Sequence, residues 1–518
     1  MRVALTGITG NMGQATLEEV LKIGEIDAFR LLVLPEDKRI KKLLKTHCAD
    51  RRRIEVLVGN LKDAETCKKL VADADFVVNM AAVIPPLSDQ NPQLAVDCNQ
   101  IGAGNLVDAI EAAGEKQPKL VHVSTMALYG NRTSAHPWAR VGDPLLVSPY
   151  DVYSATKLRG EFRVLESSIR NVAVLRQSAM LHKNMLSDNV SDGLMFHTCF
   201  NAPLEWVTAK DSGVLIANIL RKDLAGELGR EFWGQCFNIA SVAENRVTGY
   251  DTLNDGFALI GGTGKDFFRP YYNSTRNFHG VWFSDGDRLE KLFHYQKQTT
   301  ADYWREIARA HRVYKLAKML PKRLIASCVI KRLFKSPNAP AYWAKHGDEA
   351  RLIAYFGGRK NYEALPKTWE NFPLLRENKD EQGNPLDYAA LRDPAQAKLL
   401  DLGFDDAKAD GEITRADLEN VARLHGGALV SSEWSGDLYE KLEWKNRHGE
   451  TFFAKPFTVL RAGHWFNRTY EENVWEFDGL AKKDRIYAQV WLDSHRAEEN
   501  YRYGMDADFH AVIGEEKF

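Results

Sequence analysis

The chain has 518 residues, of which 44% are hydrophobic and 27% charged, and its formal net charge is −1. This composition is typical of a folded protein of several domains and gives no global attraction to nucleic acid. Its six cysteines lack C-x-x-C spacing, which argues against a zinc cage or a disulfide framework. The sequence contains no run of about twenty apolar residues, so no membrane span is predicted. Since the first apolar run is also too short for a signal peptide, we expect a protein of the reducing cytoplasm.

A glycine-rich turn near the N-terminus is the first candidate site. It follows the apolar run Val3-Ala4-Leu5, reads Thr-Gly-Ile-Thr-Gly-Asn-Met-Gly over residues 6–13 and opens a helical pattern that continues to Ile23. Such a turn lets the backbone approach a pyrophosphate, and the helix N-terminus supplies amides and the positive end of its dipole. We therefore expect a dinucleotide site, with an ordinary strand-to-helix turn as the alternative. Its predicted ligands are Gly7, Thr9, Gly10, Asn11, Met12 and Gly13.

Short apolar runs at 29–34, 54–58 and 76–78 alternate with helical segments, as in a parallel sheet with crossover helices. In such folds a carboxylate at the end of the second strand binds the ribose hydroxyl of NAD, and a cation there accepts the 2′-phosphate of NADP. Leu34 and Pro35 occupy this place, followed by Glu-Asp-Lys-Arg at 36–39. Both cofactors remain open, with a slight preference for NADP because the strand end lacks an acid.

A second candidate site combines a strand end with a later helix. The predicted strand from Leu120 ends in Ser124-Thr125, and Tyr153 and Lys157 follow about thirty residues on, four apart on a helical pattern. Because residues four apart share a helix face, the ammonium can lie beside the phenol and lower its pKa. The Thr125 hydroxyl can then polarise a substrate alcohol or carbonyl. We predict a proton relay that faces a nicotinamide, with a solvated helix face as the alternative.

Residues 1 to about 290 resemble an extended short-chain dehydrogenase/reductase of the epimerase/dehydratase type. The resemblance rests on the glycine turn, Gly59-Asn60-Leu61, Asn79-Met80-Ala81-Ala82, Asn99 with Gly102, the Ser/Thr before a Tyr-Gly, and Tyr153 with Lys157. It implies that Tyr153 is the general acid/base, that Lys157 is its electrostatic partner and a ribose ligand, and that Thr125, or alternatively Ser124, completes the triad. It also places Asn60, Leu61, Ala81 and Ala82 at the cofactor.

The expected fold is α/β, a Rossmann-like doubly wound parallel sheet with a small substrate lobe and a C-terminal α+β extension. We place the reductase domain at 1–300, a basic helical linker at 301–340 and an accessory domain at 341–518. By the resemblance, the run 236–240 completes the substrate lobe. Four apolar side chains form either a pocket wall or simply core, namely Met185, Met195, Phe196 and Phe200.

Residues 307–347 contain ten Lys or Arg and no Asp or Glu, with apolar residues at helical spacing. A basic amphipathic helix can lie on an anionic membrane or pack against the neighbouring domain. We expect an interdomain strut in which Leu316, Leu320, Leu324 and Ile330 are buried, and peripheral membrane contact is the alternative.

Two stretches of the tail resemble metal-binding modules. The segment from Asp406 to Asp417 resembles a calcium loop, but Lys408 stands at a ligand position. The stretch that begins at Leu442 and includes Gly463-His464-Trp465 weakly resembles a treble-clef zinc module, whose ligands stand near the positions of Asn446, Glu450, Phe466 and Thr469. Because none of these four is Cys or His, we expect no metal.

These observations favour an NAD(P)-dependent oxidoreductase that interconverts a secondary alcohol and a ketone on a small organic substrate. A nucleotide-sugar epimerase or dehydratase is the second hypothesis, which the sequence Arg176-Gln177-Ser178-Ala179-Met180 weakens because it departs from the pattern usual in those enzymes. The third is a cofactor-sensing scaffold protein. The expected partners are a small-molecule substrate and no nucleic acid, with a homodimer left open.

Overall fold

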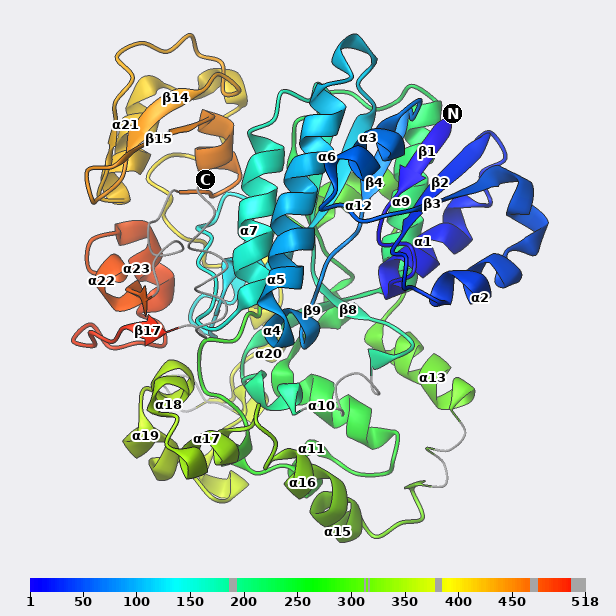
Figure 1. Ribbon diagram of the computed structural model, residues 1–518. Helices are drawn as coiled ribbons and strands as arrows, with labels where there is room; N and C mark the ends of the chain where they lie inside the picture. The colour runs from blue at the N-terminus through cyan, green and yellow to red at the C-terminus, as the bar shows by residue number, and fades with distance from the viewer. Residues whose placement is uncertain (186–192, 312–313, 315–316, 378–383, 466–473, 505–518) are drawn as a thin grey trace.

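The computed structural model describes residues 1–185, 193–311, 314, 317–377, 384–465 and 474–504. Its centre is a seven-stranded parallel sheet in the order β10-β7-β5-β4-β1-β2-β3 (Figure 1). The strands are β1 (Arg2–Leu5), β2 (Ala28–Val33), β3 (Ile54–Val58), β4 (Phe76–Asn79), β5 (Lys119–Thr125), β7 (Val172–Gln177) and β10 (Cys236–Ile239). This strand order is that of the doubly wound dinucleotide-binding fold, so the predicted fold class is confirmed.

Helices cover both faces of the sheet, which is why its strands are apolar on both sides. One face carries α1 (Asn11–Val20), α9 (Ala209–Leu224) and α12 (Asp287–Phe293). The other face carries α3 (Ala64–Val71), α6 (Gly102–Glu111) and α7 (Val152–Leu165). Two large buried clusters result, one on each face. Helix α2 (Arg39–Thr46) lies beyond the end of β2 and buries only Leu43.

The strand that was expected to complete the substrate lobe lies elsewhere. β10 pairs in parallel with β7, with Cys236 opposite Val174, and forms the edge of the main sheet. All four of its residues are buried, as a strand covered on both faces requires. The lobe is built on a separate small sheet in the order β11-β9-β8, from β8 (Ala179–Leu181), β9 (Pro203–Thr208) and β11 (Arg246–Thr248).

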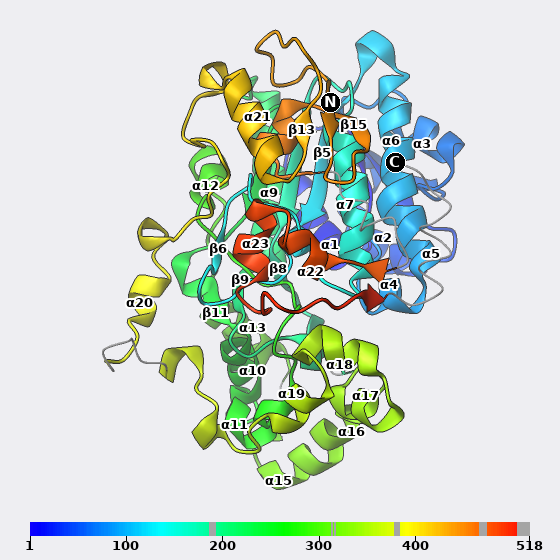
Figure 2. The same ribbon diagram turned by 90° about the vertical axis from the view of Figure 1, so that its left-hand side faces the viewer.

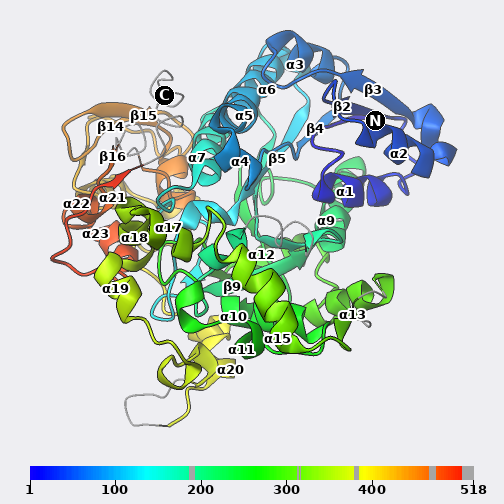
Figure 3. The same cartoon turned by 60° about the horizontal axis from the view of Figure 1, so that its bottom comes forward.

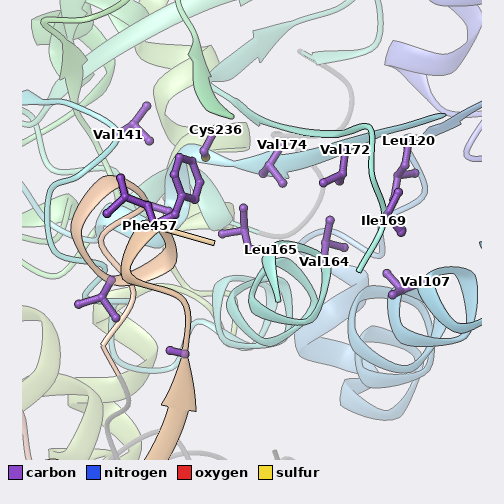
Figure 4. Close-up of a cluster of buried hydrophobic side chains, with 14 of the residues drawn as sticks. Val107, Leu120, Val141, Val164, Leu165, Ile169, Val172, Val174, Cys236 and Phe457 are labelled. Carbon is purple, nitrogen blue, oxygen red and sulfur yellow. The ribbon is translucent and has the colours of Figure 1, made fainter. Parts of the chain in front are cut away.

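The C-terminal segment packs against α7 and its neighbours. It contains α21 (Arg415–Leu424), β13 (Ala428–Leu429), β14 (Leu442–Lys445), β15 (Thr451–Ala454) and the turn η13 (Phe457–Arg461). Phe457 lies among Val141, Leu165 and Cys236 (Figure 4), and Trp444 belongs to the same buried cluster as the α3, α6 and α7 face. The tail therefore extends the core of the N-terminal part, and the boundaries at 300 and 340 stay predictions.

A second group of helices from the later part of the chain lies on the side of the main sheet towards which β5 points (Figure 2). It consists of α17 (Pro340–His346), α18 (Glu349–Phe356), α19 (Arg359–Ala364), α22 (Phe477–Ala481) and α23 (Arg485–Trp491). Trp343, Tyr355 and Trp491 share one buried cluster with Tyr129 and Leu146. These helices thus support the loops that follow β5.

The basic segment forms a series of short helices, where one amphipathic helix was expected. They are α13 (Thr300–Ala310), α15 (Lys322–Ile325), η8 (Ala326–Ile330) and α16 (Lys331–Leu333). α13 contacts β9, whereas α15 and η8 pack against α11 (Gly264–Phe267), which adjoins α10 (Gly249–Ala258). Pro321 interrupts the pattern, because proline lacks the amide that a continuing helix needs.

The expected burial of this segment is only partly observed. Ile330 is 2% exposed, as a strut requires, but Leu320 is 50% and Leu324 49% exposed, so the strut prediction is wrong for these two side chains. Leu320 lies in a bend before Pro321, and α15, which carries Leu324, has no buried residue. Leu316 lies outside the described residues. No helix in the described ranges is both long enough and apolar enough to span a membrane.

Candidate active site

The glycine turn joins β1 to α1. Gly7 has a φ of +66°, and a Cβ there would lie 2.6 Å from the carbonyl carbon of Met80, whereas one on Gly13 would lie 2.3 Å from the Gly7 oxygen. The Gly10 amide donates to that oxygen at 3.0 Å, and α1 begins without a side-chain cap. The glycines therefore let the turn close tightly. The uncapped start of the helix, with Asn11 and Met12 as its first residues, leaves amides for an anion, which fits a pyrophosphate.

Beside the turn, an acid and a cation meet at the end of β2. The Thr9 hydroxyl donates to Asp37 at 2.6 Å, and the Arg39 guanidinium donates to the same carboxylate at 2.8 and 2.5 Å. The hydrogen bond from Arg39 is the main reason why the pKa of Asp37 lies below its ordinary value. The Arg39 side chain is largely exposed, and the Asp37 side chain is mostly buried beside it. Both follow the end of the second strand, where such folds bind the ribose of the dinucleotide.

The other predicted cofactor residues lie on loops that leave neighbouring strands at the same edge of the sheet. Asn60 accepts the Lys62 amide at 3.1 Å, and the Leu61 side chain is buried. After β4, the Ala81 amide donates to the Thr6 hydroxyl at 3.1 Å, and Ala82 is exposed. The structure therefore brings all four to the edge that carries the glycine turn.

Thr125 and Tyr153 meet at one cavity. Thr125 ends β5, Tyr153 lies in the first turn of α7, and both line a cavity of about 730 Å³. Burial raises the pKa of Tyr153 to about 12, and a hydrogen bond with the Thr125 side chain opposes the rise. Ser124, the alternative to Thr125, is buried and does not line the cavity.

Lys157 is buried, and its ammonium group is directed at β5. Its Nζ donates to the Val123 carbonyl at 2.7 Å and lies 3.5 Å from Nε2 of His122. Burial lowers the pKa of Lys157 to about 8. The pKa of Tyr153 is not lowered towards neutral pH as expected, because burial dominates at the phenol.

A chain of buried polar side chains fixes the state of His122. The amides of Met80 and Ala81 donate to the Thr6 hydroxyl, so its own hydrogen goes to Oδ1 of Asn79, 2.6 Å away. The Asn79 amide nitrogen then donates to Nδ1 of His122 at 3.1 Å, which assigns the remaining ring hydrogen to Nε2. Burial and the charge of Lys157 hold the pKa of His122 well below its ordinary value. A neutral imidazole thus presents an N–H to the lysine.

Thr6 and His122 were not among the site residues predicted from the sequence. The available signal was a histidine inside the apolar run Leu-Val-His-Val of β5, since a buried polar residue in a central strand needs a partner. Asn99, which the resemblance included, holds the loop after β4 against α7. It bonds both the amide and the carbonyl of Val83 and also the Thr156 hydroxyl.

The cavity is lined mainly by apolar side chains of the substrate lobe. Met185 and Met195 line it as the pocket-wall prediction requires, whereas Phe196 and Phe200 belong to the buried core beside it. Arg351 is the one Lys or Arg among the described lining residues. Its guanidinium bonds Asp348 at 2.7 Å and lies over the Tyr150 ring.

The carboxylates of the calcium-like loop are paired with cations. Lys408 contacts both oxygens of Asp417 at 2.8 and 2.9 Å, Arg140 contacts Asp406 at 2.6 Å, and Arg461 contacts Asp410 at 3.1 Å. These ion pairs leave little negative charge for a calcium ion.

The zinc-module positions are described only in part. Asn446 bonds Glu450 at 3.0 Å, and Phe466 and Thr469 lie outside the described residues. Within the described part of the chain, no three His, Cys, Asp or Glu side chains gather as a metal site.

Comparison with known proteins gives partial matches. Residues 5–169 match the family of GDP-mannose 4,6 dehydratase. Over 167 residues the chain is 29% identical to a dTDP-glucose 4,6-dehydratase of Mycobacterium tuberculosis, which corresponds to 32% of this chain and 48% of that protein. Over 168 residues it is 26% identical to an uncharacterized membrane protein of Methanocaldococcus jannaschii, or 32% of this chain and 43% of that protein. The chain thus spans less than half the length of these relatives.

Two solved structures are also similar. One is a dTDP-glucose 4,6-dehydratase from Bacillus anthracis in complex with NAD, at a TM-score of 0.48 and 18% identity, covering 61% of this chain and 98% of that one. The other is a UDP-glucuronic acid 4-epimerase from Bacillus cereus in complex with UDP-glucuronic acid and NAD, at a TM-score of 0.47 and 18% identity, covering 60% and 100%.

Proposed function

Because the N-terminal part of the chain is an extended short-chain dehydrogenase/reductase domain of the epimerase/dehydratase type, we propose that the protein is an NAD(P)-dependent oxidoreductase. It interconverts a secondary alcohol and a ketone on an apolar small organic substrate. One observation carries this proposal: the Thr125 and Tyr153 side chains meet at an apolar cavity beside the edge of the sheet that carries the glycine turn. The chemistry needs a proton donor and a place for the hydride carrier, and the chain offers both at this edge.

The cofactor residues are the glycine turn with Thr9, Asn60 and Leu61 for the dinucleotide, and Ala81 and Ala82 for the loop beside it. Bound there, the nicotinamide supplies or accepts the hydride. Lys157, four residues after Tyr153 on α7, completes the set as a ribose ligand.

The proton chemistry belongs to Tyr153 and Thr125. Since the pKa of Tyr153 is raised to about 12, the phenol carries its proton at neutral pH and can donate it to a carbonyl oxygen. The Thr125 hydroxyl orients that oxygen. As the carbonyl carbon receives the hydride, the oxygen takes the phenol proton, and the buried Lys157 stabilises the phenolate that remains. Alcohol oxidation is the same step reversed.

A nucleotide-sugar epimerase or dehydratase is the second candidate, favoured by the names of the relatives that residues 5–169 resemble. The cavity argues against it. A nucleoside diphosphate presents two phosphates, which proteins usually bind through arginine or lysine. Arg351, the one such residue among the described lining residues, already pairs with Asp348.

The test incubates the full chain with NAD or NADP and a panel of apolar secondary alcohols, and then with the reduced cofactors and the matching ketones. We expect reduced nicotinamide to accumulate in step with ketone. Conversion of dTDP- or UDP-sugars without net cofactor turnover, together with no reaction on the apolar panel, would establish the second candidate. If neither panel reacts although NAD(P) binds, the cofactor-sensing scaffold becomes the better description.

A further inference from the structure

Several apolar side chains of the basic segment lie open to solvent. Met319 is 82% exposed, beside Leu320 and Leu324, and Val329 lies one turn of helix further on at 38%. The exposed cations Lys318, Lys322, Arg323, Lys331 and Arg332 are interleaved with them. We call these nine residues the docking surface. They lie at the outer end of the substrate lobe, where α15 borders α10 and α11 (Figure 3).

Most of the positive charge of the docking surface has no ion-pair partner among the described residues. Lys322 pairs with Asp266 of α11 at 2.9 Å. Among the residues that the structure describes, no further ion pair involves a cation of the docking surface, and residues 307–347 contain no Asp or Glu. The surface therefore complements a partner that is strongly anionic and also accepts apolar side chains.

The inner face of the same short helices packs behind the wall of the active-site cavity. Ile325 and Ile330 pack in one apolar cluster with Phe257 and Ile260 of the region around α10, and both of those residues line the cavity. The stem of Lys318 lies 3.4 Å from the position a Cβ on Gly261 would take. The docking surface and the cavity thus lie on opposite sides of this apolar cluster.

We propose that the docking surface binds the anionic surface of a lipid bilayer. Cations attract the headgroups, and the exposed Met319, Leu320 and Leu324 enter the boundary between headgroups and acyl chains. Spaced leucines and a methionine between lysines fit this boundary better than they fit an acidic protein, whose carboxylates would leave the apolar side chains in water.

This binding deepens the proposed function. If the apolar cavity takes a lipophilic alcohol or ketone, the membrane is the phase in which such a molecule dissolves, and docking holds the cavity wall against it. Only the origin of the substrate rests on the proposed function, because the docking does not require catalysis.

The test is co-sedimentation of the full chain with vesicles of phosphatidylcholine alone or with added phosphatidylserine, at about 50 mM and about 500 mM salt. The first variant is Arg323→Glu/Lys331→Glu/Arg332→Glu, and the second is Met319→Ser/Leu320→Ser/Leu324→Ser. The matched control is Lys41→Glu/Lys42→Glu/Lys45→Glu, which makes the same charge change on α2, where all three lysines are exposed.

We expect the unmodified chain and the control to bind the anionic vesicles at low salt and to be released at high salt. Each cation near an anionic surface contributes about fivefold in partitioning, so the charge variant should bind at least tenfold less. The serine variant should also bind less, because its apolar anchor is gone.

Absence of binding by the unmodified chain, equal binding by the charge variant, or an equal loss in the control would overturn the proposal. Titration of the same samples with NADP keeps the two questions separate. Vesicle binding without cofactor binding would refute the oxidoreductase alone, and the reverse would refute the docking alone.

Discussion

Nε2 of His122 lies 3.5 Å from Nζ of Lys157, with an N–H directed at the amine. The direction follows from the hydrogen bonds behind the ring, because Thr6 and Asn79 leave Nδ1 as an acceptor. An N–H so close to an ammonium disfavours the charged lysine, in the same direction as burial, which lowers the pKa of Lys157 to about 8. His122 is therefore a positioning residue that acts through Lys157.

Replacing His122 should shift the alkaline limb of turnover. Asn in its place can keep an acceptor for Asn79 but removes the group that faces Lys157. We expect the pKa of Lys157 to rise, so that in His122→Asn the fall in ketone reduction at alkaline pH moves up by about 0.5 to 1 pH unit. His122→Gln, whose amide reaches the place of Nε2, is the control and should stay near the original profile. Equal profiles for both variants would refute the role of His122.

Tyr153→Phe should retain the fold and the affinity for NAD(P) and lose turnover by about 10² or more, since general acid/base catalysis contributes about 10² to 10⁴. Tyr150→Phe is a matched control, because Tyr150 lines the same cavity three residues earlier. We expect only a small effect there. The measurement is single-turnover reduction at saturating cofactor. Most of the activity surviving in Tyr153→Phe, with the chemical step shown to be rate-limiting, would remove Tyr153 from the mechanism.

Arg39→Ser should lower the affinity for NADP at least about tenfold and change that for NAD little, because a charge-assisted contact to a phosphate is the interaction that is lost. Lys41→Ser, an exposed cation on the same helix, is the control. Binding is measured by titration with both cofactors. If Arg39→Ser lowers the affinity for neither cofactor while Asp37→Ser lowers the affinity for NAD, Asp37 is the residue that binds the ribose and the preference for NADP is wrong.

Local patterns were sufficient to predict the strands and the glycine turn, because each depends on neighbours within a few residues, whereas the triad stays a prediction. β3 begins and ends at the predicted residues, Ile54 and Val58. The position of β10 beside β7 was not predictable, since a buried apolar run fits the centre of either sheet. The exposure of Leu320 and Leu324 was also not predictable, because periodicity shows which residues share a helix face but not whether another element covers it.

The tail adds a further long-range relationship that the sequence did not indicate. Nε2 of His464 lies 2.9 Å from Oε1 of Glu161, one turn beyond Lys157 on α7, and Arg176 donates to the same oxygen at 2.6 Å. All three side chains are buried. Burial lowers the pKa of His464 despite its anionic partner, and the charge of Arg176 is the main cause that lowers the pKa of Glu161.

We expect this site to destabilise the protein in mild acid. Because the folded pKa of His464 is depressed, the folded state keeps a neutral imidazole while the unfolded chain takes up a proton below about pH 6.5. The free energy of unfolding therefore falls as the pH drops through that value, by at most about 1.4 kcal/mol per pH unit for this one proton. The depressed pKa of Glu161 affects stability only at a lower pH. Its contribution to the free energy of unfolding is complete above about pH 4.3 and is lost only below that value.

The measurement is urea unfolding of the full chain from about pH 8 to about pH 5.5. His464→Gln keeps an N–H donor for Glu161 and removes the titration, so its stability should fall less steeply over this range than that of the unmodified protein. His448→Gln, at an exposed histidine in the same tail, is the control and should reproduce the original slope. If the slope is the same in His464→Gln, another group causes the acid sensitivity. A flatter slope would show that the tail is coupled to the helix that carries Tyr153 and Lys157.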